Sequence, residues 1–342
     1  MALPVGRALR TAVVCSDRRA KLERARGYPY ARPPSSYALI RHTPYCFEDR
    51  LWLGAGGFET LRVSKLGGGS VELRIDEALG AEGMAWTASS SWTPVLAIGS
   101  NAGHSQLCRK YPTDLFPDGV VIPVVRSVLH DFDVCYAPII TSYGSVAATL
   151  QHSPGTAVEL FVTFLDDAAL AHMHKTEGAY DLQELSGIKL EIGTSLEGWM
   201  RGAQPATTLS SALTYVHQHG AVRLPCGGAK SPVALEEINA EKRRFHSLSQ
   251  VEMQGALRFC LGHHEEEAGA ELKDLPHWPK STADTKLWKD DIELDDWILR
   301  NIDDEAVRKA YLPRLVATAH AFQFSGAVKL ASLGDMYSAN VK

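Results

Sequence analysis

The sequence predicts an α+β fold with a β-rich N-terminal region and a helical C-terminal region. Between Tyr37 and Ile75, short apolar runs separated by glycines are typical of strands. From residue 94 to residue 262, apolar runs alternate with segments that begin with helix-capping residues. The amphipathic pattern from Asp291 to Phe324 indicates helices. We therefore expect an N-terminal arm and β-rich extension (1–93), a core (94–262), and a linker with a C-terminal helical extension (263–342).

The composition is typical of a soluble globular protein, with 45% apolar and 22% charged residues in a chain of 342. The net charge of −5 provides no electrostatic basis for binding nucleic acid or an anionic membrane. No apolar run approaches the roughly 18 residues needed to cross a bilayer. A small neutral or zwitterionic partner remains open, and so does the oligomeric state.

The six cysteines are widely spaced, and no two of them form a Cys-x-x-Cys pair. This pattern favours reduced thiols over a disulfide framework or a zinc site. The first 14 residues contain arginines but neither a long apolar core nor a small-residue cleavage site, so no secretion signal is predicted. Together these features predict a cytoplasmic protein without a metal site or a cofactor.

The N-terminal region is predicted to begin with a short basic helix over Asp17–Arg26. The prolines that follow, Pro29, Pro33 and Pro34, fix φ and remove hydrogen-bond donors, so this segment is expected to be a wrapped arm or linker. Gly67–Gly69 lacks the Gly-Lys-Ser/Thr of a phosphate loop and is interpreted as a turn. The predicted strands are Tyr37–Ile40, Leu51–Leu53, Thr60–Val63 and Val71–Ile75.

The core is predicted to begin with a buried strand over Val95–Ile98, where four apolar residues follow one another. The segment Gly103–Tyr111 is expected to be a helix that ends before Pro112. Further strands are predicted at Val120–Val128, Phe132–Tyr136, within Tyr143–Leu150 and at Ala157–Leu165, with a loop at Ser153–Gly155 between the last two.

Helix signals become frequent after residue 165. Asp166 and Asp167 suit the N-cap of a helix over Ala168–Thr176, and Gly178 stands where that helix should end. Ser231-Pro232 has the residues of a helix start and predicts a helix to about Phe245. The remaining predicted elements are a strand at Ile188–Ile192, a helix at Ser249–Leu261, and a helical region at Asp291–Phe324 interrupted near Pro313. The runs Ser211–His217 and Ala221–Leu224 continue the mixed pattern without indicating one element type.

A sharp corner follows the strand Val95–Ile98. Gly99 permits a tight bend, and Ser100 and Asn101 suit a turn or a helix cap. Backbone N–H groups at such a corner can hold a carboxylate, an amide oxygen or a developing oxyanion. An ordinary strand-to-helix turn explains the same residues, so a second feature is needed before a function can be assigned.

The segment from Tyr143 to Tyr180 supplies that second feature. It contains Tyr-Gly-Ser-Val-Ala-Ala-Thr-Leu, a Ser-Pro-Gly turn, a buried strand, a helix led by two aspartates, and then Glu177-Gly178. In this order, after a strand that ends in Gly-Ser-Asn, the motifs resemble those of the γ-glutamylcyclotransferase-like family over about residues 94–200. The resemblance implies a small mixed β-barrel-like sheet with surrounding helices.

Carried over residue by residue, the resemblance implies that Gly99, Ser100 and Asn101 hold the γ-glutamyl group and that Glu177 is the catalytic acid/base. The family's leading Tyr is Ile98 in this chain, which removes a hydroxyl group from the pocket wall.

The resemblance also bears on the substrate. The glutathione-specific branch of the family has Leu where this chain has Asn101, so glutathione is a less expected substrate. Tyr143 and Tyr180 flank the motif segment and are candidate pocket residues, although an aromatic residue beside a glycine turn is more often involved in packing.

The reaction implied by the resemblance converts a γ-glutamyl amide into 5-oxoproline and a free amine. The substrate's α-amine attacks its own γ-carbonyl, and one carboxylate can move the proton from the attacking nitrogen to the leaving nitrogen. Two alternatives stay open. The same pocket can serve amide hydrolysis or acyl transfer, or the fold can be a non-catalytic module that binds a small molecule or a protein.

Two other groups of residues in the sequence are candidates for a function. Cys226 lies near His217 and His219 in the sequence and could be a thiol nucleophile with a histidine base, although most such cysteines are structural. Arg109 and Lys110 could attract a substrate carboxylate, although exposed helix charges are the commoner explanation.

Overall fold

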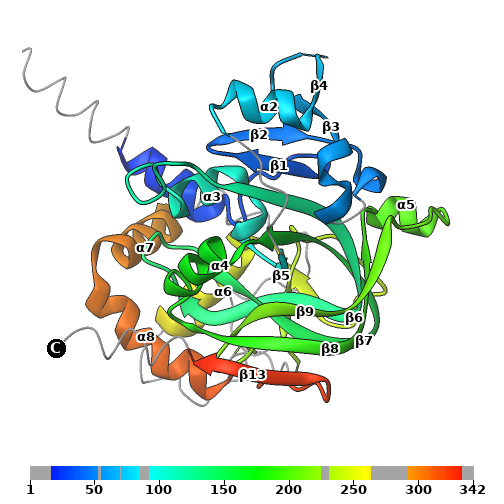
Figure 1. Ribbon diagram of the computed structural model, residues 1–342. Coiled ribbons are helices and arrows are strands. Elements are labelled where there is room, and N and C mark those ends of the chain that lie inside the picture. Colours follow the sequence, from blue (N-terminus) through cyan, green and yellow to red (C-terminus); the bar gives the residue numbers. More distant parts are fainter. Residues whose placement is uncertain are drawn as a thin grey trace, which may run out of the picture.

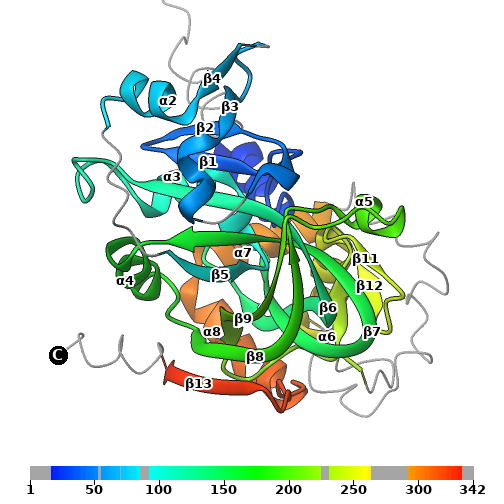
Figure 2. The same cartoon turned by 45° about the vertical axis from the view of Figure 1, so that its right-hand side comes forward.

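A closed five-stranded barrel lies at the centre of the protein (Figures 1 and 2). The computed structural model describes residues 17–52, 55–69, 71–84, 92–224, 231–262 and 292–332. The barrel strands run in the order β7-β5-β9-β8-β6, and pairing of β6 with β7 closes the ring. Their bounds are β5 Thr93–Ala97, β6 Val121–Ile140, β7 Val146–Leu165, β8 Tyr180–Ile192 and β9 Thr207–His217.

The strand directions make the barrel mixed. β5 and β9 run parallel, with Val95 opposite Leu213, and the other neighbouring pairs are antiparallel. Closure leaves no free edge within the ring, so each of these strands has a paired neighbour on both sides. The predicted α+β fold with a mixed barrel-like sheet and surrounding helices is confirmed.

The two longest strands, β6 and β7, are each continuous over 20 residues. The sequence prediction divided each of them, with a loop at Ser153–Gly155 in β7, and that division is wrong. Asp131 and Gly155 have φ values of 65° and 84°, and the Gly155 N–H donates to the Asp131 carboxylate at 2.7 Å. The pairing register shifts between His130 and Phe132. The turn residues therefore mark a bulge at which the strands bend without leaving the sheet.

Strands from the N-terminal region extend the sheet outward from β6. β1 Tyr37–Ile40 has the predicted bounds and pairs with β6, and β2 Thr43–Cys46, β3 Arg62–Lys65 and β4 Glu72–Arg74 follow in order. Residues 67–69 form the predicted turn. The strand predicted at Leu51 is wrong, because Leu51 ends the short 3-10 helix η1 Asp49–Leu51. A second 3-10 helix, η2, spans Ala55–Thr60, and Ile75 begins helix α2 Ile75–Ala81.

Most of the predicted core helices are present. Residues 17–26 are helical, and α3 His104–Lys110, α4 Asp167–Lys175 and α6 Gln250–Gly262 agree with the predicted segments to within one or two residues. A short helix that was not predicted, α5 Leu196–Met200, starts at an N-cap serine, Ser195. The predicted cap is present at α4, where the Asp166 side chain accepts from the Ala169 N–H, whereas the cap of α5 was missed.

The helix predicted from Ser231 to Phe245 is wrong. The segment forms β10 Val233–Leu235 and β11 Ala240–Glu241, and β12 His246–Leu248 follows it. All three side chains of β10 are buried, and Ala234 pairs with Cys135 of β6. Pairing with the barrel outweighs the Ser-Pro signal, since proline is also compatible with the start of an extended strand.

The C-terminal region contains α7 Ile292–Asp303 and α8 Glu305–Ala317. The predicted interruption near Pro313 is wrong, because Pro313 lies inside α8 and the break falls at Asp304, which accepts a hydrogen bond from the Ala306 N–H at 2.8 Å. The chain then adds an unpredicted strand, β13 Ala327–Ser332, to β8. Strands from all three predicted segments therefore join one sheet, and the three-part division of the chain stays a prediction.

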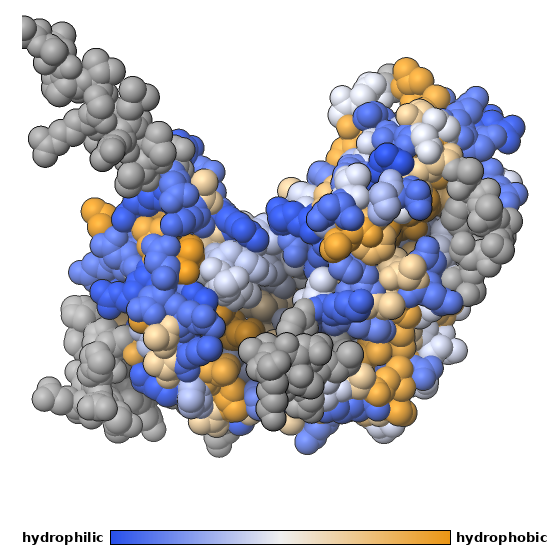
Figure 3. Space-filling model, turned by 60° about the vertical axis from the view of Figure 1, so that its left-hand side comes forward, coloured by the Kyte–Doolittle hydropathy of each residue, from blue (hydrophilic) through white to orange (hydrophobic). Residues whose placement is uncertain are grey.

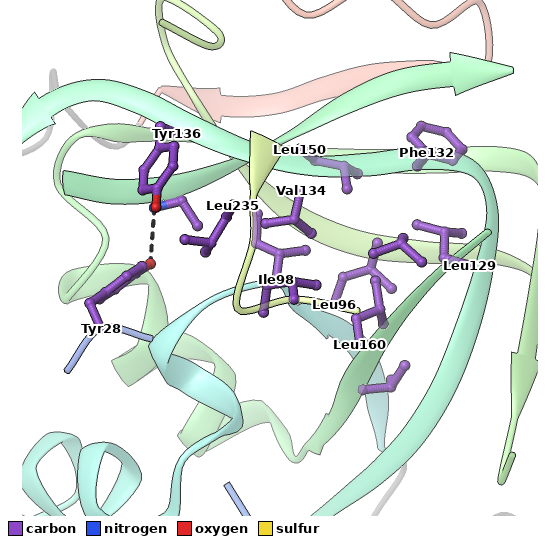
Figure 4. Packing of buried hydrophobic residues seen from close by; sticks show 14 of the residues in the cluster. Tyr28, Leu96, Ile98, Leu129, Phe132, Val134, Tyr136, Leu150, Leu160 and Leu235 are labelled. Atoms are coloured by element: carbon purple, nitrogen blue, oxygen red, sulfur yellow. Dashed lines mark hydrogen bonds between the residues drawn. The ribbon is translucent and has the colours of Figure 1, made fainter. Parts of the chain in front are cut away.

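The barrel encloses an apolar core. Figure 4 shows Leu96 and Ile98 of the β5 end among Val134, Leu150 and Leu160 from β6 and β7. Ile98 is 7% exposed and contributes to this core. Within the apolar run that identified β5, Leu96 and Ile98 pack in this core, whereas Val95 and Ala97 pack in a second apolar cluster, as the alternation of side chains along a strand requires.

The cysteines only partly follow the prediction. Cys46, Cys108 and Cys135 are free thiols, as expected. Cys260 is disulfide-bonded, so the prediction of reduced thiols is wrong for that residue. Sequence spacing did not reveal this bond, because the fold decides which cysteines approach each other.

Several large apolar side chains are exposed, among them Val71, Leu115 and Ile292. Figure 3 shows a face that is hollowed between two ridges, with mainly hydrophilic residues along the rims. Within the ranges given above, no helix is long and apolar enough to span a membrane.

A buried ion pair joins β6 to the segment after β11. Asp133 is fully buried, and Arg243 Nε donates to its two carboxylate oxygens at 3.2 and 3.0 Å. Burial raises the pKa of Asp133 from 3.8 to about 6, because desolvation outweighs the stabilising charge and hydrogen bonds of Arg243. The native state therefore holds this proton more strongly than the unfolded state does.

This pKa shift predicts a pH dependence of stability. Because the folded-state pKa is raised, the contribution of Asp133 is most favourable below pH 4 and is lost as the pH rises from about 4 to about 6. The shift corresponds to at most about 3 kcal/mol in the free energy of unfolding. Urea unfolding of the wild type and Asp133→Asn between pH 4 and pH 7 measures it. Equal pH slopes for the two proteins would contradict the prediction.

Candidate active site

A cavity of about 310 Å³ opens at the end of β5, between α3, α4 and the N-terminal arm. It brings together two segments that lie about 76 residues apart in the sequence, the corner after β5 and the end of α4. All seven candidate site residues line this one cavity: Ile98, Gly99, Ser100, Asn101, Tyr143, Glu177 and Tyr180.

The corner is the turn from β5 into the 3-10 helix η3 Ser100–Ala102. The Tyr37 hydroxyl donates to the Ala102 carbonyl at 2.9 Å and ties the end of η3 to β1. N–H groups at a helix start lack an intrahelical acceptor, and Gly99, Ser100 and Asn101 line the cavity. The corner is therefore held rigidly by the sheet while its first residues face the cavity.

Glu177 follows α4 and lies opposite the corner. Asp166 caps α4 by accepting a hydrogen bond from the Ala169 N–H at 2.8 Å, and Thr176 is the C-cap. The helix thus ends where the sequence indicated and turns Glu177 into the cavity. Asn101 Nδ2 donates to Glu177 Oε1 at 2.9 Å, which joins the two predicted parts of the site directly.

Lys110, the last residue of α3, forms an ion pair with Glu177. The side chains are 10% and 12% exposed, so the pair is largely screened from water by the cavity walls. The sequence suggested Lys110 as a carboxylate-attracting residue together with Arg109. Arg109 instead donates to Gln106 and lies over the Tyr30 ring, so only Lys110 of the two reaches the carboxylate.

Four tyrosines line the cavity: Tyr28, Tyr143, Tyr180 and Tyr215. Burial raises the pKa of each hydroxyl well above 10, and the negative charge of Glu177 contributes to the shift in all four. The hydroxyls therefore stay protonated at neutral pH. Together with Leu96, Ile98 and Ile139, the rings make the walls mainly apolar around one ion pair.

Tyr28 is a cavity residue that the sequence did not indicate. It lies on the arm after helix 17–26, and its hydroxyl accepts a hydrogen bond from the Ala148 N–H at 2.9 Å. Tyr180 donates to the Ala148 carbonyl at 2.9 Å, so two tyrosines satisfy both backbone groups of one β7 residue. A Cβ on Gly99 would lie 2.3 Å from the Tyr28 hydroxyl oxygen. Gly99 is therefore required for close packing of the arm.

The arm is held in place by the C-terminal region. Helix 17–26 forms ion pairs with α7, between Arg18 and Asp296 at 2.8 Å and between Lys21 and Asp303 at 3.0 Å. Both chain extensions thus support the wall that carries Tyr28. No pattern within the arm itself indicates this contact, because it depends on residues almost 300 positions away.

The second candidate group was Cys226 with His217 and His219. Cys226 lies outside the described residues, so the thiol hypothesis stays untested. His217 is buried beside the Tyr180 ring, with ring centroids 5.5 Å apart, and burial lowers its pKa to about 4. A histidine in this state is neutral at physiological pH and packs against the wall of the cavity.

Comparison with known proteins gives a likeness of fold. No family model and no curated protein matches the chain. A solved structure named gamma-glutamyl cyclotransferase is similar at 14% identity with a TM-score of 0.27, covering 61% of this chain and 99% of its own. An uncharacterized protein from Homo sapiens is similar at 14% identity with a TM-score of 0.28, covering 61% and 98%.

The first of these names agrees with the family that the sequence resembles.

Proposed function

We propose that this protein is a γ-glutamylcyclotransferase that converts a γ-glutamyl amide into 5-oxoproline and the free amine. The observation that carries the proposal is the hydrogen bond between Asn101 and Glu177 inside one cavity. It joins a corner that can hold the substrate to a carboxylate that can move a proton.

The reaction consumes no water. The substrate's α-ammonium gives a proton to Glu177, and the amine nitrogen then attacks the γ-carbonyl carbon to form a five-membered ring. The bond from that carbon to the amide nitrogen breaks, and the leaving nitrogen takes the proton from Glu177. The ring nitrogen gives its second proton to the regenerated Glu177 carboxylate, which passes it to the released amine. One carboxylate therefore acts first as the base and then as the acid.

The cavity supports this reaction mainly by positioning. The attack is intramolecular, so holding the substrate in a folded shape can contribute roughly 7–11 kcal/mol. N–H groups of the Gly99–Asn101 corner can stabilise the oxygen that becomes negative, and the protonated tyrosines add hydroxyl groups to the walls. The mainly apolar walls strengthen these interactions by keeping water out.

The test is a panel of γ-glutamyl amides of alkylamines, amino acids and anilines, incubated with the purified protein. Mass spectrometry is expected to detect 5-oxoproline and the free amine in equal amounts. The α-glutamyl isomers are the matched controls, because their α-amine cannot close the same five-membered ring on the amide carbonyl. Release of glutamate instead would support the hydrolase alternative. Binding without turnover would support the non-catalytic one.

A further inference from the structure

The described lining of the cavity contains two side chains with a formal charge, Lys110 and Glu177, and these pair with each other. An unpaired charge in so enclosed a place is strongly unfavourable. Each side chain therefore neutralises the other. Any ligand that takes Glu177 away from Lys110 must provide a new partner for the ammonium.

The position of Lys110 is set by contacts between α3 and α4. The Lys110 carbonyl lies 2.6 Å from His172 Nε2, and the Tyr111 hydroxyl donates to the Ala169 carbonyl at 2.9 Å. The side chain then passes Met173, whose Sδ is 3.3 Å from Nζ, to reach Glu177. The helix end is fixed, whereas the four-carbon stem of lysine allows Nζ to move within the cavity.

Both contacts to Glu177 are made at the same oxygen. Lys110 Nζ and Asn101 Nδ2 each donate to Oε1, and no hydrogen bond from the described residues reaches Oε2. A ligand donor can therefore approach Oε2 before the Lys110 contact breaks. This arrangement allows the partner of Glu177 to be exchanged in steps, without a stage at which the carboxylate is unpaired.

We propose that Lys110 binds the α-carboxylate of the substrate, leaving Glu177 as the substrate's α-ammonium takes its place. This inference rests on the proposed function. A zwitterionic head group carries the same two charges as the Lys110–Glu177 pair, so the exchange pairs every charge again and adds no net charge to the cavity. The exchange also moves the Lys110 ammonium away from Glu177 at the stage where Glu177 must accept a proton.

The exchange makes the free α-carboxylate a requirement for the substrate. A γ-glutamyl compound whose α-carboxylate is converted to a carboxamide brings an ammonium group alone. Two cations would then share one carboxylate, and Lys110 would have no new partner. Lys110 is thus a positioning residue that selects substrates by a group remote from the amide that breaks.

The test compares a chromogenic γ-glutamyl anilide with its α-carboxamide analogue. In the wild type, kcat/KM for the free acid is expected to exceed that for the carboxamide by about 30-fold or more, as for other buried charge pairs. Lys110→Met should lower kcat/KM for the free acid by a similar factor and bring the ratio of the two substrates close to one. A general loss of folding lowers both rates and leaves their ratio unchanged.

Two further variants complete the design. Lys110→Arg keeps the charge and should keep a preference for the free acid, which tests the inference if the Met variant does not fold. Lys175→Met is the matched control, because Lys175 is an exposed lysine on α4 two residues from Glu177 and does not line the cavity. It should retain the wild-type ratio.

Calorimetric binding separates this inference from the proposed reaction. Glutamine, which carries the same head group and a γ-amide, should bind the wild type about 30-fold more tightly than its α-carboxamide and should lose this advantage in Lys110→Met. If no γ-glutamyl amide is turned over but this pattern is found, the reaction fails and the role of Lys110 stands. Two outcomes would overturn the role of Lys110. One is turnover by Lys110→Met with the wild-type ratio of free acid to carboxamide, and the other is a wild type that does not prefer the free acid.

Discussion

Glu177→Gln is expected to lower kcat for 5-oxoproline formation by about 10²–10⁴-fold. Glutamine has nearly the same shape and keeps an oxygen that can accept the Asn101 bond of 2.9 Å, but it cannot take up a proton. Substrate then binds in the same cavity with no base for its α-ammonium and no acid for the leaving nitrogen. The measurement is steady-state kinetics on the best amide of the panel.

Two further variants serve as controls for Glu177→Gln. Glu197→Gln removes an exposed carboxylate of α5 and should leave kcat unchanged. Glu177→Asp keeps the acid one methylene further from its partners and should retain more activity than the glutamine variant. If Glu177→Gln forms 5-oxoproline with the wild-type kcat, Glu177 is not the acid/base for any substrate of the panel.

Gly99→Ala is expected to lower activity by about 10²-fold and stability by about 1–3 kcal/mol. The new Cβ would lie 2.3 Å from the Tyr28 hydroxyl oxygen and 3.3 Å from the Ala148 Cβ. The Tyr28 ring must therefore move, which breaks its bond to the Ala148 N–H and displaces the corner that faces Glu177. Urea unfolding and kinetics of the same preparation measure both effects.

The cause of the Gly99 effect can be tested by a rescue. Tyr28→Phe removes the oxygen at 2.3 Å and leaves the ring carbon Cζ at 3.3 Å, so alanine at position 99 should cost less stability in this background. The two changes should then be strongly non-additive in a double-mutant cycle. Gly80→Ala is the matched control, since a Cβ there meets nothing within 4 Å. Additive effects of Gly99→Ala and Tyr28→Phe would contradict the proposed clash.

Local patterns predicted the elements that carry the site. The apolar run before Gly99 predicted β5, and the aspartates before residue 168 predicted α4 and so the end at which Glu177 stands. These predictions held because burial and capping act within a few residues of the chain. The resemblance then named the corner and Glu177 together, and both line one cavity.

Local patterns failed where pairing with the barrel decided the outcome. The Ser-Pro signal at residue 231 predicted a helix, yet Val233–Leu235 is a strand beside β6. Ser153–Gly155 reads as a loop, yet it is a bend within β7, held by the bond from Gly155 to Asp131. In both segments the free energy of long-range strand pairing and burial exceeds the local preference, and no window of the sequence contains both partners.

The sequence by itself determined which segment turns sharply after a buried strand and which glutamate follows a capped helix, because both depend on neighbouring residues. Only the tertiary structure decided what surrounds them. Tyr28 reaches the cavity from an arm supported by α7, and Lys110 reaches Glu177 because α3 and α4 pack together. These contacts join residues far apart in the chain, so their chemistry exists only after the barrel has closed and the two ends have packed on it.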